Sequence, residues 1–162
     1  SGWAGPEIYT SCEGTHSVTG NSFVGNTLNG AFAGSSTVTF TGNAFRQNRI
    51  GISLYAVDAS VAGASPSRAD TVVTIQGNVF DANTIDGLYA ERYAGTTVRR
   101  IVATVGGTST GQSNVFSNHV APAYHAISCL NLTTQFACPV GGNSFSNNVD
   151  DIEAACPTSC RK

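Results

Sequence analysis

The sequence has few charged residues and no methionine. Only 11% of its 162 residues are Asp, Glu, Lys or Arg, whereas soluble domains average about 25%. So few charges argue against long solvated helices. The net charge of -2 also gives no sign of a nucleic-acid partner. Because methionine is absent, we expect a processed chain or a piece of a larger protein or assembly.

Long hydrophobic runs are absent as well. No apolar stretch approaches the roughly 18 residues of a membrane helix, so we expect no membrane span. The chain is nevertheless 41% hydrophobic, with Val, Ile and Phe throughout, which argues against disorder. Its 18 glycines and many Asn, Ser and Thr residues suit short strands joined by turns.

The five cysteines include no CxxC pair and have no neighbouring histidines, so we expect no zinc site or other metal site. In a polar chain of low charge they predict disulfides, and hence a secreted or cell-surface protein. Cys129 and Cys138 flank a loop, and we expect a bond between them to close its base. Cys156 and Cys160 either bond to each other or pair elsewhere, for example with Cys12.

One short motif, Asn-x-Phe, recurs along the chain. Its five copies begin at Asn21, Asn43, Asn78, Asn114 and Asn143. Another Asn follows five residues later in every copy but the fourth, which has His119 there; these residues are Asn26, Asn48, Asn83 and Asn148. Segments that alternate Val, Thr, Ile or Phe precede the motif and predict strands with one buried face. The first two copies are 22 residues apart, which fits three short strands and three turns.

Units of this kind are expected to stack as the coils of a parallel solenoid. Each strand would lie about 4.8 Å from its counterpart in the next coil, so equivalent side chains would also stack. The second Asn of each unit would then form a hydrogen-bonded ladder, and the Phe residues would fill the core beside it. The rival fold is a β-sandwich, but a sandwich would not require the same Asn-x-Phe in each unit.

The repeats resemble those of a known superfamily. The strings at 20–26, 42–54 and 77–88 look like the parallel β-helix repeats of the pectin-lyase-like superfamily. The resemblance implies an all-β, right-handed parallel β-helix over residues 14–153, and the five repeats predict about five coils. Open ends of a solenoid expose unpaired strand edges, so we expect an N-terminal cap at 1–13 and a Cys-containing tail at 154–162 to cover them. It says little about activity, because this superfamily includes lyases, hydrolases, epimerases, phage tailspikes and adhesins.

The later units are longer than the first, and their main insertions follow the same strand. In a solenoid such loops emerge on one side, which is often the binding side. Arg, Tyr and a carboxylate gather there, a mixture that suits recognition of sugar or protein. The predicted binding residues are Tyr55, Arg68, Tyr89, Glu91, Arg92, Tyr93, Arg99 and Arg100. The alternative is that these loops only cover a sheet face, with the charges serving solubility.

Acidic residues are too sparse to indicate a catalytic centre. Polysaccharide enzymes of this superfamily use clusters of acids, often with calcium, together with Arg or Lys. The candidates for such roles here are Asp81, Asp86 and Arg49. An Asp in a turn more often bonds its own backbone.

We therefore expect an extracellular or cell-surface module without catalytic activity or cofactor, which binds glycan or a cell-surface protein through its loop-lined face. One alternative is a polysaccharide lyase, hydrolase or epimerase, or a fragment of one, and only this alternative would call for Ca²⁺. The other is a purely structural spacer or fibre segment.

Overall fold

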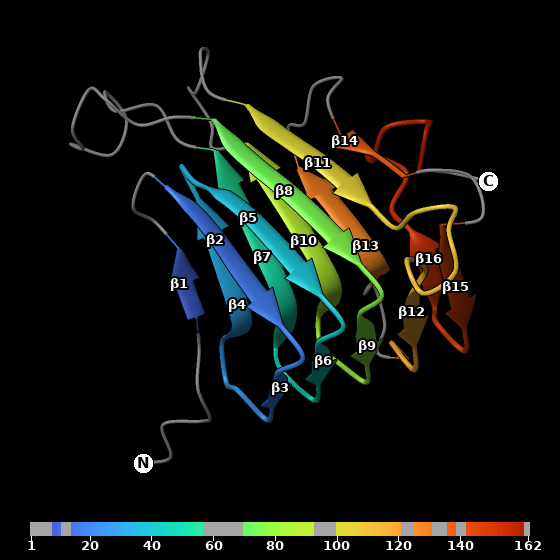
Figure 1. Cartoon of the computed structure of the whole chain (residues 1–162). Coiled ribbons are helices and arrows are strands. Elements are labelled where there is room, and N and C mark those ends of the chain that lie inside the picture. Colours follow the sequence, from blue (N-terminus) through green and yellow to red (C-terminus); the bar gives the residue numbers. More distant parts are fainter. Residues whose placement is uncertain are drawn as a thin grey trace.

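The strands of this protein form three parallel sheets, and successive strands along the chain join the three sheets in a regular order (Figure 1). The computed structural model describes residues 8–10, 14–56, 70–92, 100–120, 125–130, 136–138 and 142–160. Within these ranges the chain forms strands and turns and no helix. Accordingly, no helix that could cross a membrane occurs among the residues described.

Each sheet collects one strand from each successive coil. Sheet A contains β1 (Ile8–Thr10), β4 (Asn29–Gly34), β7 (Ile50–Ala56), β10 (Asp86–Arg92), β13 (His125–Leu130) and β16 (Asp150–Ile152). Sheet B contains β2 (Thr15–Thr19), β5 (Thr37–Thr41), β8 (Thr71–Gln76), β11 (Ile101–Val105) and β14 (Phe136–Ala137). Sheet C contains β3 (Ser22–Val24), β6 (Ala44–Arg46), β9 (Val79–Asp81), β12 (Asn114–Ser117) and β15 (Asn143–Ser146).

This arrangement confirms the expected all-β architecture of stacked parallel strands. The chain passes from sheet A to B to C and back to A, which gives about five rungs and is consistent with a parallel β-helix. β1 lies within the segment predicted to be a cap, and it pairs with β4 as a further strand of sheet A.

The phenylalanine of each Asn-x-Phe motif points into the core. Phe23, Phe45, Phe80, Phe116 and Phe145 stack in a row, with ring centroids 4.9, 5.2, 4.6 and 5.3 Å apart. The first four are almost fully buried, and Phe145 packs against the core at the end of the row. Because stacked strands repeat at about the same distance, the ring from each coil can stack on the ring from the next.

The predicted asparagine ladder runs through the turns from sheet C to sheet A. The Nδ2 group of Asn26 donates to Oδ1 of Asn48 at 2.8 Å, and that of Asn48 to Oδ1 of Asn83 at 3.2 Å. His119 continues the row, with Nε2 3.4 Å from Nδ2 of Asn83 and Nδ1 2.9 Å from Oδ1 of Asn148. These contacts fit a neutral imidazole with its proton on Nδ1. Burial lowers the pKa of His119, which favours this neutral form.

The first Asn of each motif forms a second ladder in the turns from sheet B to sheet C. Nδ2 donates to Oδ1 of the next coil at 3.0 Å from Asn43 to Asn78, 3.1 Å from Asn78 to Asn114 and 2.9 Å from Asn114 to Asn143. Each of these amides also donates to a backbone carbonyl, as Asn43 does to Val18 at 2.8 Å. The two ladders therefore satisfy buried polar groups of two turns in each coil.

Glycine follows the second Asn for a steric reason. A Cβ on Gly51 would lie 2.4 Å from the carbonyl oxygen of Gly87 in the next coil and 2.8 Å from the ring of Phe80. A Cβ on Gly30 or Gly87 would likewise approach a backbone carbonyl oxygen and a phenylalanine ring of the following coil. The recurring glycine thus allows the close approach of stacked backbones beside the phenylalanine row.

The three main insertions themselves lie outside the described residues, but the strands that flank them are described. Each falls between a strand of sheet A and the following strand of sheet B: between β7 and β8, β10 and β11, and β13 and β14. Figure 1 shows the corresponding ends of these strands on one side of the molecule.

The predicted disulfide pairing is wrong. Cys129 bonds Cys156 and Cys138 bonds Cys160, so neither the bond from Cys129 to Cys138 nor a local bond from Cys156 to Cys160 forms. Cys129 occupies a buried core position of β13, and Cys138 follows β14 in another sheet. The C-terminal tail is within reach of both and is fastened to two sheets of the last coil. Cys12 lies outside the described residues.

Replacing Asn48 with Leu is expected to lower the free energy of unfolding by about 3 kcal/mol. The substitution leaves the backbone N–H of Asn26 and the carbonyl of Phe23 without their buried partner. Urea unfolding would measure the loss. The matched control, Thr84→Leu, changes an exposed side chain beside the ladder residue Asn83 and should cost far less. Equal losses in the two variants would contradict the structural role of the ladder.

The double variant Cys129→Ser/Cys156→Ser is expected to lose about 3 kcal/mol of stability, since this bond closes a large loop. Peptide mapping of the non-reduced wild-type protein tests the pairing itself. It should yield linked peptides from residues 129 and 156, and from residues 138 and 160. A peptide linking Cys129 to Cys138 would contradict the described arrangement.

Candidate functional site

The outer face of sheet A carries most of the predicted binding residues that the structure describes. Leu88 and Ala90 are fully buried in the core, while Tyr89 between them is half-buried and points outward, as alternation predicts. The register sets Tyr89 beside Ser53 and Ser128, and Glu91 beside Tyr55 and Leu130. Strands β4, β7, β10 and β13 therefore bring outward side chains from four coils onto one surface.

Three aromatic rings lie together on this face, and we call them the aromatic cluster: Phe32, Tyr55 and Tyr89. The centroid of Tyr55 is 5.3 Å from that of Phe32 and 5.9 Å from that of Tyr89. The hydroxyl of Tyr89 donates to Oε2 of Glu91 at 3.0 Å. Burial, followed by this hydrogen bond to the carboxylate, raises the pKa of Tyr89, so the phenol keeps its proton. All three rings are half-buried.

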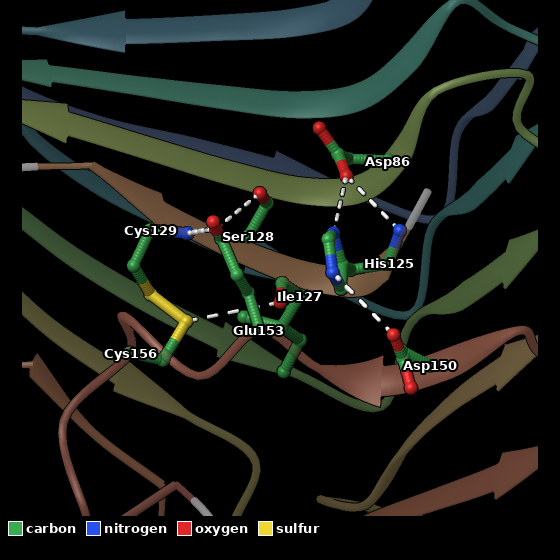
Figure 2. A network of polar contacts seen from close by, with 8 residues as sticks. All are labelled: Asp86, His125, Ile127, Ser128, Cys129, Asp150, Glu153 and Cys156. Atoms are coloured by element: carbon green, nitrogen blue, oxygen red, sulfur yellow. Dashed lines mark hydrogen bonds and ion pairs between the residues drawn. A yellow bond between two sulfur atoms is a disulfide. The ribbon is translucent and has the colours of Figure 1, made fainter. Parts of the chain in front are cut away.

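A second group lies at the N-terminal ends of the same strands, where His125 stands between two carboxylates. Nδ1 of His125 is 4.0 Å from Oδ1 of Asp86, and Nε2 is 3.7 Å from Oδ2 of Asp150. The backbone N–H of His125 also donates to Oδ1 of Asp86 at 3.3 Å. Figure 2 shows the imidazole between the two acids, which come from β10 and β16. A protonated His125 would be paired on both sides.

Asp86 is the most perturbed carboxyl group of this face. Its side chain is only 6% exposed, whereas that of Asp150 is 66% exposed. Burial raises the pKa of Asp86 to about 6, and the backbone and charge of His125 oppose that rise only in part. A carboxyl group with such a pKa can hold or release a proton close to neutral pH, which is the property required of a general acid or base.

The C-terminal tail adjoins this group. Oε2 of Glu153 accepts from the hydroxyl of Ser128 at 2.6 Å and from the backbone N–H of Cys129 at 2.8 Å. Cys156 is bonded to Cys129 just beyond (Figure 2). These contacts attach the tail to β13, the strand that begins with His125.

The other predicted binding residues are more scattered. Arg100 pairs with Asp70, with Nη2 3.0 Å from Oδ2, just before β11 and β8 begin. Arg92 is half-buried at the end of β10, and alternation places it on the opposite side of the strand from Glu91. Arg68, Tyr93 and Arg99 lie outside the described residues.

The candidate catalytic residues do not form one group in the described part of the chain. Asp81 belongs to sheet C, where it accepts hydrogen bonds from Ser117 and Asn118, both at 2.7 Å. These two bonds lower its pKa, which keeps it ionised in a structural role. Asp86 belongs to sheet A, and Arg49 is exposed in the turn before β7. Within the described ranges, no group of three or more His, Cys, Asp or Glu could hold a metal ion.

Sequence reasoning did not foresee Phe32, His125 and Asp150 as members of the outer face of sheet A. A signal was present, because Asp86 precedes Gly87 and His125 precedes Ala126 at the same point of the coil. When the units are aligned at this small residue, Asp86 and His125 fall at equivalent positions of neighbouring coils, where side chains stack.

Comparison with protein-family models, with curated proteins and with solved structures gave no match to this chain.

Asp86→Asn is expected to flatten the pH dependence of stability. The pKa of Asp86 rises from 3.8 to about 6 on folding, so the folded state binds this proton more tightly than the unfolded state. The resulting stability is fully present below pH 3.8 and is lost as the pH rises through 6. The shift corresponds to about 3 kcal/mol.

Urea unfolding of both proteins between pH 4 and pH 7 measures this effect. Relative to the wild type, Asp86→Asn should become more stable as the pH rises over this range. The control, Asp150→Asn, alters an exposed carboxylate beside the same histidine and should follow the wild-type curve closely. A constant difference between Asp86→Asn and the wild type would show that Asp86 does not titrate in this way.

Proposed function

We propose that this chain is a right-handed parallel β-helix of the pectin-lyase-like kind and serves as an extracellular or cell-surface module that binds glycan without turning it over. The handedness follows from the general preference of parallel crossovers, about 98% of which are right-handed. The secreted or surface location is supported by the two disulfides, since such bonds persist in oxidising compartments.

The observation that carries the binding proposal is the aromatic cluster with Glu91. Aromatic rings offer flat apolar surfaces with polar edges, which suit the C–H faces of a sugar ring. Glu91 adds a carboxylate, which accepts hydrogen bonds and is held in place by the Tyr89 hydroxyl. A few placed polar groups beside apolar surface are the usual composition of a ligand site. The rigid strands beneath reduce the entropy lost on binding.

A second candidate function is catalysis on a polysaccharide, as in a lyase, hydrolase or epimerase. The observation that favours it is the pair of Asp86 and His125, because a buried carboxyl with a pKa of about 6 beside an imidazole is suited to proton transfer. Calcium would enter only with this candidate. A structural spacer would use neither the aromatic cluster nor Asp86.

Tyr89→Ala is expected to weaken glycan binding by about tenfold or more, which corresponds to about 1.4 kcal/mol. A glycan array with the wild-type protein would find the ligand, and calorimetry would compare the variants. Glu91→Gln should also weaken binding, because it removes a charged acceptor while keeping the shape. The control, Val115→Ala, changes an exposed side chain on sheet C and should bind like the wild type.

The outcomes separate the candidate functions. Binding that survives both Tyr89→Ala and Glu91→Gln would disprove a site at the aromatic cluster. Release of sugar products by the wild type, lost in Asp86→Asn, would establish the enzyme instead. Absence of any bound or cleaved glycan would leave a protein partner or the spacer role, and would overturn the proposed function.

A further inference from the structure

The outer face of sheet B differs from the rest of the molecule in its composition. Its inward positions, such as Val38, Phe40 and Ile75, are buried in the core, and the alternate positions face outward. These outward residues are Thr15, Ser17, Thr19, Thr37, Thr39, Thr41, Val72, Thr74, Gln76, Val102 and Thr104. We call this surface the threonine face. None of its residues is charged, and hydroxyl groups predominate.

The register turns these residues into columns. Ser17, Thr39, Thr74 and Thr104 are direct partners across β2, β5, β8 and β11. On one side of this column stand Thr15, Thr37, Val72 and Val102, and on the other Thr19, Thr41 and Gln76. Strand spacing places neighbours about 4.8 Å apart along a column, and alternate residues of a strand about 6.7 Å apart. The result is a two-dimensional grid.

The grid is held rigidly. Thr and Val are branched at Cβ, so their side chains keep few rotamers. Beneath them the stacked phenylalanines and the two asparagine ladders fix the spacing of the coils. Figure 1 shows β2, β5, β8 and β11 side by side with little change in direction. The edge strand departs from the pattern, because the hydroxyls of Ser17 and Thr19 lie 3.2 Å apart and bond to each other.

At the margin of this face, two charged groups of the described residues are paired with each other. Arg100 and Asp70 form a salt bridge before β11 and β8 begin. The grid itself is therefore uncharged in a protein that has charges on its other faces. A charged side chain would hold a hydration shell of its own, whereas a threonine hydroxyl can take the place of a water molecule in an ordered layer. The adjoining methyl groups order the water next to them.

We propose that the threonine face binds the surface of ice. A grid that repeats in two directions matches a crystal, which repeats likewise, better than a single small ligand. The surface of ice is a regular array of water molecules. The threonine face offers hydroxyls, which can replace water molecules in such an array, and methyl groups, with neither charges nor aromatic rings. A crystalline polysaccharide would favour aromatic rings, which the described part of this face lacks. This activity is independent of glycan binding on sheet A.

The test measures thermal hysteresis and ice recrystallisation with the purified wild-type chain, together with its incorporation into a growing ice crystal. The wild type should depress the freezing point below the melting point, shape the crystals and enter the ice. Thr39→Lys and Thr74→Lys, in the middle of the grid, should each lose most of the hysteresis. The matched control, Ser22→Lys on exposed β3 of sheet C, should retain it.

Circular dichroism and thermal unfolding confirm that each variant remains folded, and Thr39→Ser provides a mild variant expected to lose only part of the activity. A wild-type protein that is excluded from ice overturns the proposal. So does equal loss of hysteresis in Thr39→Lys and Ser22→Lys. Binding to crystalline cellulose or chitin without binding to ice, or self-association blocked by Thr39→Lys without ice activity, would assign the face to another occupant.

Discussion

Exact stacking of coils, imposed by side-chain amides, is the constraint on which the rest of this structure depends. An asparagine both donates and accepts, so each amide bonds its counterpart in the next coil and still reaches a backbone carbonyl. The ladder accommodates His119 because a neutral imidazole also has one donor and one acceptor. Coils joined in this way share one repeat distance, and the phenylalanine row and the close glycine contacts need that same distance.

The ends of such a stack require separate solutions. At the C-terminal end Asp151 accepts from the Asn148 amide at 3.1 Å, in place of a further asparagine. Two disulfides hold the tail against the last coil, and Glu153 bonds β13 from outside. At the other end of the ladder, Oδ1 of Asn26 is a buried acceptor that no described donor reaches. The termination of the solenoid is therefore specific to this chain, whereas its middle is repetitive.

The same register gives the sheets different surfaces. On sheet A it collects three aromatic rings, and beside them two carboxylates around a histidine. On sheet B it aligns threonines into columns. Each surface is built from residues of several coils that are far apart in sequence, so a single coil could form neither. Rigid strands place these side chains before any ligand arrives, which is why both faces are suited to binding.

The sequence by itself determined the strands, the coil length, the stacked Asn and Phe and the strand after which each main insertion falls, because these depend on local alternation and on a repeat visible in the chain. It also indicated that Tyr89 points outward. The disulfide partners, the environment of Asp86 and the grouping of Phe32 with Tyr55 were decided only by the tertiary structure. These depend on which residues become neighbours between coils, and unequal insertions change that spacing, so counting along the chain does not reveal it.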